Sequence, residues 1–194
     1  MVETPHPSAP PDAVAASATA AATPAGPPRA RAPGLAGLGL DIARPLVIVD
    51  VDEVLGHFME GFGAFLAGRG LEFRVERFAL FQNIYQPGAT EHLPIEEGRR
   101  HYDDFFRYGS GEMRVAEGAA EALRRLSEQA GVVILTNAPG QGRLARARWL
   151  GRHDLDYPLL LNSGPKGPLA AALAEQAKGP AAFIDDLLPN LDSV

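Results

Sequence analysis

The chain contains four short apolar runs after its first 45 residues. They cover residues 46–49, 132–135, 157–161 and 181–184. Uninterrupted apolar runs of this length predict strands that are buried on both faces, as in a parallel sheet. Amphipathic or Ala-rich segments between them predict helices over residues 119–130, 142–151 and 168–177. Short parallel strands joined by helices predict a three-layer, Rossmann-like α/β domain with the first strand in the centre of its sheet.

A stretch of different character, residues 56–114, follows the first predicted strand. It contains most of the phenylalanines, and its pattern predicts helices over residues 57–67, 75–85 and 94–108. A simple crossover between parallel strands needs about 30 residues in all, far fewer than separate Asp50 from Thr136. We therefore expect a small helical insertion at 56–114, with residues 44–55 and 115–194 forming the α/β domain.

Residues 1–43 are rich in Pro and Ala and contain little apolar bulk, which predicts a disordered tail. The Ala-rich part of this segment has no Lys or Arg before it, unlike a secretion signal, so we expect a cytoplasmic protein. The net charge of −6 argues against nucleic-acid and acidic-membrane partners. The absence of cysteine excludes disulfides, zinc–thiolate sites and thiol catalysis.

Each predicted strand, or the loop after it, delivers polar side chains to one edge of the sheet. These residues are Asp50, Asp52, Thr136, Asn137, Lys166, Asp185 and Asp186. The carboxyl ends of parallel strands are where such sheets bind ligands. Four converging carboxylates repel one another unless a cation lies among them, and oxygen ligands favour Mg²⁺ shared with a substrate phosphate. A hydroxyl and an ammonium group suit the other phosphate oxygens.

Each of these signals has an ordinary structural interpretation when it is taken alone. Asp50 and Asp52, or Asp185 and Asp186, are also typical of helix caps. Lys166 alone would be a solvated loop lysine. The segment around it lacks the glycine spacing and the following Ser or Thr of a nucleotide P-loop. Only the joint appearance of all the groups at strand ends favours a catalytic site.

In this order, the motifs resemble those of the haloacid dehalogenase (HAD) superfamily of phosphohydrolases. The resemblance runs over residues 46–191 and is carried by four segments. These are the strand ending in Asp50-Val51-Asp52, then Ile134-Leu135-Thr136-Asn137, then Lys166, then Phe183-Ile184-Asp185-Asp186. It implies that residues 56–114 form a small helical cap of the C1 type, and that the chain stops before the usual C-terminal edge strand of the sheet.

The resemblance also implies a role for each residue. Asp50 would be the nucleophile and Asp52 the general acid and base, kept protonated by neighbouring carboxylates. Thr136, Asn137 and Lys166 would bind the substrate phosphate. Asp50, the backbone carbonyl of Asp52, and Asp186 supported by Asp185 would bind Mg²⁺.

The resulting prediction is a Mg²⁺-dependent phosphatase that hydrolyses a small phosphorylated metabolite through an aspartyl-phosphate. A phosphotransferase or mutase on the same site and a non-catalytic binding domain are the alternatives. The resemblance implies neither a phosphonatase, because residues 56–114 contain no Lys, nor a dehalogenase, because Asp52 is present. Polar candidates for substrate contact in the insertion are His57, Gln82, Asn83, Arg99, Arg100, His101 and Tyr102. Phe58, Phe62, Phe65, Phe78 and Phe81 are expected to form its core.

Overall fold

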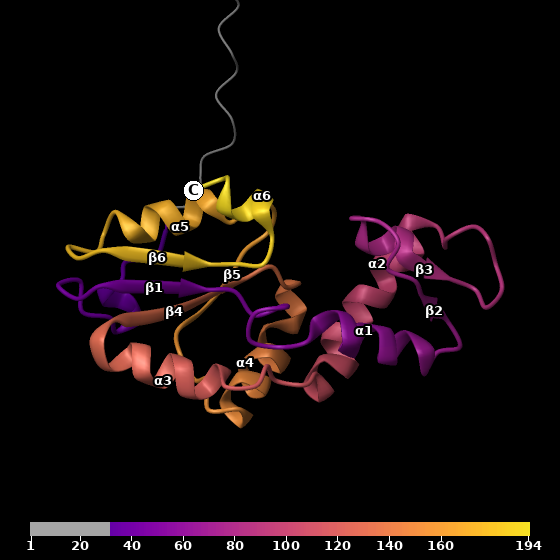
Figure 1. Ribbon diagram of the computed structural model, residues 1–194, viewed down its shortest axis with the longest axis horizontal. Helices are drawn as coiled ribbons and strands as arrows, with labels where there is room; N and C mark the ends of the chain where they lie inside the picture. The colour runs from indigo at the N-terminus through magenta and orange to yellow at the C-terminus, as the bar shows by residue number, and fades with distance from the viewer. Residues whose placement is uncertain (1–31) are drawn as a thin grey trace, which may run out of the picture. The chain divides into compact units, whose positions relative to one another are not determined.

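A computed structural model describes residues 32–194, which contain a four-stranded parallel sheet (Figure 1). The sheet order is β5 (Leu159–Leu161), β4 (Gly131–Thr136), β1 (Leu46–Val49) and β6 (Ala181–Ile184). All three strand pairs are parallel, and β1 lies in the interior of the sheet between β4 and β6. The predicted parallel α/β sheet with a central first strand is confirmed.

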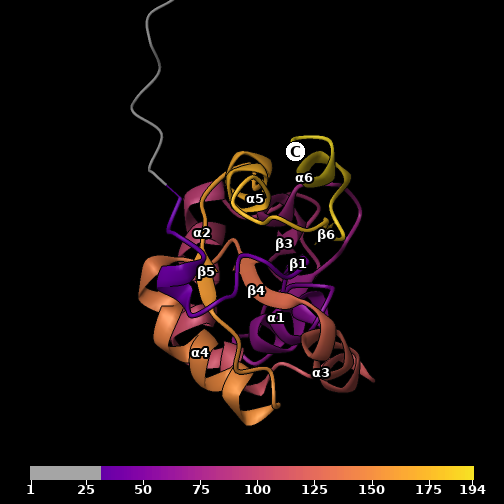
Figure 2. The same ribbon diagram turned by 90° about the vertical axis from the view of Figure 1, so that its left-hand side faces the viewer.

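Helices cover both faces of this sheet. They are α3 (Ala119–Gln129), α4 (Arg143–Arg152), α5 (Gly167–Ala174) and the short α6 (Leu188–Leu191). Figures 1 and 2 show α3 and α4 on one side of the sheet and α5 and α6 on the other. The domain therefore has the three layers expected from the alternation of apolar runs and helical segments. Among residues 32–194, no helix has the length and apolar content needed to cross a membrane.

Two apolar clusters lie on opposite faces of the sheet. Successive side chains of a strand point to opposite faces, so Val47 and Val49 enter the cluster that contains α3 and α4. Leu46 and Ile48 enter the cluster that contains α5. The first cluster continues into the insertion through Phe62 and its aromatic neighbours. This shared apolar core packs the insertion directly against the α/β domain.

The insertion mixes helices with a two-stranded antiparallel sheet. It contains α1 (Phe58–Ala67), β2 (Glu72–Phe73), a 3₁₀ turn (Leu80–Asn83), β3 (Ile84–Tyr85), α2 (Ile95–Asp104), a π-helical turn (Phe105–Gly109) and a second 3₁₀ turn (Ser110–Glu112). The helices predicted over residues 57–67 and 94–108 correspond to α1 and to α2 with the π-helical turn.

The helix predicted over residues 75–85 is wrong. The buried side chain of Asn83 accepts a hydrogen bond from the Glu76 N–H at 3.2 Å and donates one to the Arg77 carbonyl at 2.9 Å. These bonds hold residues 76–79 as a loop before the 3₁₀ turn at Leu80–Asn83, and β3 then pairs with β2. An asparagine side chain that bonds nearby backbone groups competes with helix formation, which explains the failure of the periodicity argument here.

Phe78 also differs from expectation, because it does not join the core of the insertion. Phe58 and Phe62 are buried as predicted, whereas Phe78, within the loop, is 82 % exposed. A large aromatic side chain held in solvent by an ordered loop gains no stability from burial.

The expected disordered tail also needs correction over its last part. Its first 31 residues lie outside the described residues. Over residues 32–43, however, Leu35 is 2 % exposed and belongs to the cluster beneath α5. Gln176 reaches this segment with both ends of its amide, accepting from the Leu35 N–H and donating to the Pro33 carbonyl. One well-placed leucine and two hydrogen bonds thus fix a segment whose composition predicted disorder.

Candidate active site

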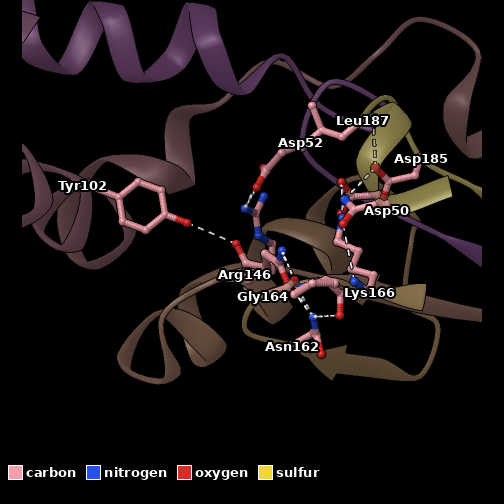
Figure 3. Close-up of polar contacts among 12 residues, drawn as sticks. Asp50, Asp52, Tyr102, Arg146, Asn162, Gly164, Lys166, Asp185 and Leu187 are labelled. Atoms are coloured by element: carbon pink, nitrogen blue, oxygen red, sulfur yellow. Dashed lines mark hydrogen bonds and ion pairs between the residues drawn. The ribbon is translucent and has the colours of Figure 1, made fainter. Parts of the chain in front are cut away.

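Asp50 and Lys166 form the buried centre of the predicted site (Figure 3). Asp50 is the residue directly after β1, and its backbone N–H donates to the Ile184 carbonyl of β6. The Lys166 Nζ lies 2.6 Å from Asp50 Oδ2 and 2.7 Å from Asp185 Oδ2. Both residues are almost fully buried, at 3 % and 2 % exposure. The lysine predicted from its loop position is therefore joined to carboxylates from two different strands.

Asp185 is positioned by several donors. Its Oδ1 accepts hydrogen bonds from the Leu187 N–H at 3.0 Å and from Asn190 Nδ2 at 2.9 Å, while Oδ2 accepts from Lys166. Asn190 Oδ1 in turn accepts from the Lys166 N–H at 3.4 Å. Because both oxygens of Asp185 are occupied in this way, its main structural effect is to fix Lys166.

Asp50, Asp185 and Asp186 form a cluster that is suited to a cation. Each offers a carboxylate oxygen, and these oxygens lie within 4.8 Å of one another. Three carboxylates and the one ammonium group of Lys166 leave two negative charges at this edge of the sheet. Asp50 Oδ1 is buried and has no hydrogen-bond partner within residues 32–194. An unpaired buried carboxylate oxygen is costly, and a divalent cation would compensate it.

The pKa values of two of these carboxyl groups rise above their ordinary range. Burial is the largest cause for Asp50 and raises its pKa to about 6, against the opposing effect of Lys166. Burial also raises the pKa of Asp186, and the neighbouring Asp185 carboxylate adds to the effect. Both shifts follow from crowding negative charge in a poorly solvated position, so a bound cation would reverse them.

Asp52 pairs with an arginine that the sequence argument did not identify. Arg146 Nη2 of α4 lies 2.7 Å from Asp52 Oδ1 and 2.9 Å from Oδ2. The residue is 1 % exposed, and its guanidinium also lies over the Phe106 ring. The expected surroundings of Asp52 need correction, because the charged side chain that contacts its carboxylate is the Arg146 guanidinium and not another carboxylate. The Asp52 carboxylate is not part of the acidic cluster.

The burial of Arg146 could have been recognised from the sequence pattern of its helix. The i, i+4, i+7, i+8 spacing of one helical face is followed by Gly142, directly before α4, and by Arg146, Trp149 and Leu150 within it, and all four are buried. The other arginines of that helix are not buried. An arginine on the apolar face of an amphipathic helix requires an anionic partner, since a buried unpaired charge is strongly unfavourable. Asp52 is that partner.

Thr136 and Asn137 occupy the end of β4, beside the carboxylates. The Thr136 hydroxyl is buried and has no hydrogen-bond partner within the described chain, and Thr136 does not line the cavity described below. Phosphate binding by Thr136 therefore stays a prediction. The Asn137 side chain donates to the Gly164 carbonyl and accepts from Asn162, which holds the loop before Lys166. The structure thus gives Asn137 a positioning role, and direct contact between its side chain and a substrate stays a prediction.

A cavity of about 390 Å³ opens above these groups, between the strand ends and the insertion. Asp50, Asp52, Asn137, Lys166 and Asp186 line it from the α/β domain. Of the seven polar candidates in the insertion, Asn83 and Tyr102 line it. The Tyr102 hydroxyl donates to the Asn137 carbonyl at 3.1 Å and so ties the insertion to the end of β4 (Figure 3). Another cavity, lined by Arg107, Arg148 and Arg152, contains none of the predicted site residues.

Comparison with known proteins supports the fold that carries this site. No protein-family model and no curated protein matches the sequence. Among solved structures, the chain is similar to YfnB of Bacillus subtilis, a protein assigned to the HAD-hydrolases and crystallised with magnesium. The TM-score is 0.52, and the match covers 76 % of this chain and 80 % of that one at 13 % sequence identity. The fold is HAD-like. At this identity the likeness concerns the fold alone.

Proposed function

We propose that this protein is a Mg²⁺-dependent phosphatase that hydrolyses a small phosphomonoester through an aspartyl-phosphate at Asp50. The observation that carries the proposal is the buried Asp50, with one oxygen bound to Lys166 and the other without a partner in the acidic cluster. A purely structural ion pair has no need of a third carboxylate close by. A nucleophile that reacts with a phosphoryl group beside a metal ion needs further carboxylates to bind that ion.

The side chains of the cluster suit Mg²⁺ because every available ligand is an oxygen. Asp50 and Asp186 would hold the ion together with the backbone carbonyl of Asp52, and Asp185 would support them by fixing Lys166. When bound, Mg²⁺ supplies positive charge that offsets the negative charge of the phosphoryl group. The excess of two negative charges at this edge matches one divalent ion.

In the first step, a carboxylate oxygen of Asp50 attacks phosphorus and forms a new P–O bond. The bond between phosphorus and the alcohol oxygen breaks, and its electron pair stays on that oxygen. Lys166 stabilises the charge of the transferring group, and the free hydroxyl of Thr136 donates to one of its oxygens. Asp52, which lines the same cavity, gives its proton to the departing alcohol oxygen.

In the second step, Asp52 takes a proton from a water molecule that attacks the phosphorus atom. The P–O bond to Asp50 then breaks, which releases inorganic phosphate and restores the Asp50 carboxylate. Arg146 would position Asp52 for this role, because its Nη2 contacts both oxygens of the Asp52 side chain.

Release of inorganic phosphate from 4-nitrophenyl phosphate by the purified full-length chain tests this proposal. We expect turnover that requires Mg²⁺, that chelation removes, and that Asp50→Asn abolishes. Adding glycerol or glucose to the reaction separates hydrolysis from transfer, because a phosphotransferase would release nitrophenol faster than phosphate. A folded wild-type protein that binds Mg²⁺ and shows no turnover would instead support a non-catalytic domain.

A further inference from the structure

The two sides of the cavity differ sharply in chemistry. The α/β side presents the carboxylates and Lys166. The insertion presents mainly apolar side chains, namely Phe58, Met59, Val75, Phe78, Ala79, Leu80 and the ring of Tyr102. A phosphate held at Asp50 therefore places the remainder of its ester against an apolar wall.

Few polar groups on this wall are free to bind a ligand. Both polar atoms of the Asn83 side chain already bond the backbone at Glu76 and Arg77. The Tyr102 hydroxyl donates to the Asn137 carbonyl. Arg77 is the only charged side chain that residues 56–114 contribute to the lining of this cavity. A sugar or polyol would lose its water hydrogen bonds here without recovering them, which is unfavourable.

The most exposed part of the wall is also held in place. Asn83 fixes the loop of residues 76–79, and the Arg74 N–H donates to the Asn83 carbonyl at 2.8 Å. Phe78 lies in this loop and Val75 directly before it, and they are 82 % and 62 % exposed. Apolar side chains presented to solvent by an ordered loop beside a polar site are typical of ligand contact.

We propose that the substrate of this site is the phosphomonoester of an apolar alcohol, with an alkyl, isoprenoid or aryl group packed against Phe78, Val75 and Leu80. This inference takes the reaction from the proposed function. It takes the class of substrate from the apolar side chains that the insertion contributes to the cavity. The apolar group gains by leaving water, and Arg77, the one charged side chain that residues 56–114 contribute to the lining, is exposed to solvent and can stay hydrated.

A series of ethyl, butyl and hexyl phosphate tests the proposal, because these alcohols differ in length and hardly in acidity. We expect kcat/KM to rise about two- to fourfold for each added CH₂ until the cavity is filled. Propyl phosphate and glycerol 1-phosphate form a matched pair with equal carbon number, and we expect propyl phosphate to be preferred by roughly tenfold or more. No gain with chain length, or a preference for glycerol 1-phosphate, would overturn the proposal.

Phe78→Ala tests the wall itself. Because Phe78 is mostly exposed, the variant should fold, and we expect it to lower the gain for each CH₂. Tyr108→Ala is the matched control, since Tyr108 is another exposed aromatic residue of the insertion that does not line this cavity. The control should keep the wild-type dependence on chain length. Equal behaviour of the two variants would show that the loop does not bind the ester.

Calorimetric binding of the same alkyl phosphates, with Mg²⁺ present, keeps this inference separate from the proposed function. If 4-nitrophenyl phosphate is hydrolysed and the alkyl series shows no trend, the phosphatase proposal stands and the apolar-substrate proposal fails. If no ester is hydrolysed, the wild-type protein serves directly for binding. Tighter binding of hexyl than of ethyl phosphate would then support the apolar site, and equal binding would overturn it.

Discussion

The α/β edge and the wall of the insertion line the same cavity, yet they are built on opposite principles. At the edge, Lys166 and the carboxylates are buried and connected by hydrogen bonds that fix each group. On the wall, Phe78 and Val75 are exposed and make no such bonds. Buried, mutually positioned charges are suited to one reaction, because small displacements would be costly there. An exposed apolar wall is suited to choosing among substrates.

This contrast predicts different consequences for substitutions on the two sides. Changes at the edge should alter the rate for every phosphate ester alike. Changes on the wall should alter which ester is preferred.

The largest effect is expected for Asp50→Asn. Loss of the nucleophile should lower turnover of every ester by at least ~10⁴-fold, whatever its alcohol group. Asp156→Asn, at an exposed position away from the cavity, is the matched control and should retain wild-type activity. Phosphate-release assays on 4-nitrophenyl and hexyl phosphate check both. Residual activity that depended on the alcohol would place the nucleophile elsewhere.

The second effect concerns the ion pair between Asp52 and Arg146. Asp52→Ala leaves a buried guanidinium without its anion and should lower the free energy of unfolding by about 3 kcal/mol. The double variant Asp52→Ala/Arg146→Met removes both charges and should recover more than half of that loss. Urea unfolding measures all three proteins. If the double variant were less stable than the single one, the pair would not be the source of the loss.

The third effect is a pH dependence of Mg²⁺ binding. The pKa of Asp50 is raised to about 6 by burial, so a proton competes with the metal ion below that pH. We expect Mg²⁺ affinity, measured by calorimetry, to fall roughly tenfold between pH 7 and pH 5. In the metal-free protein the same raised pKa means that the fold loses stability as the pH rises toward 6. An affinity that stays constant over this range would contradict the assignment of Asp50 as a ligand.

The smallest effect on stability is expected for a substitution on the wall. Phe78→Ser should change the free energy of unfolding by less than about 0.5 kcal/mol, because the ring is already in solvent. Phe62→Ala, in the fully buried core of the same insertion, should lower it by about 3–5 kcal/mol. Thermal and urea denaturation would check both. A large loss for Phe78→Ser would mean that the loop has a structural role.

The sequence predicted the α/β edge well because its determinants are contiguous. Each strand is an apolar run, and the rule that parallel strands end at one edge places Asp50, Lys166 and Asp186 together without any knowledge of side-chain packing. These residues were predicted, and the structure places them together. Their roles in catalysis stay predictions, as does a cytoplasmic location.

The wall, the order at Leu35 and the buried Arg146 were harder to predict, because each depends on a local exception or on a residue far away in the sequence. The loop that carries Phe78 depends on two side-chain hydrogen bonds of Asn83, which leave no periodic signal. The order at Leu35 depends on Gln176, 141 residues further along the chain. The burial of Arg146 could have been predicted from the sequence, because this residue lies on the apolar face of a predicted helix. Its partner Asp52 lies 94 residues away in the sequence, so the pairing could be identified only from the folded structure.

The most direct test of the central claim is to trap the phosphorylated enzyme. Asp52→Asn should slow hydrolysis of the aspartyl-phosphate, while 4-nitrophenol, a good leaving group, departs without help from an acid. After acid quenching and digestion, mass spectrometry should find one phosphoryl group on the peptide that contains Asp50, and only when Mg²⁺ was present. Phosphate release by the wild type with no phosphorylated Asp50 in either protein, and no loss of activity in Asp50→Asn, would contradict the account.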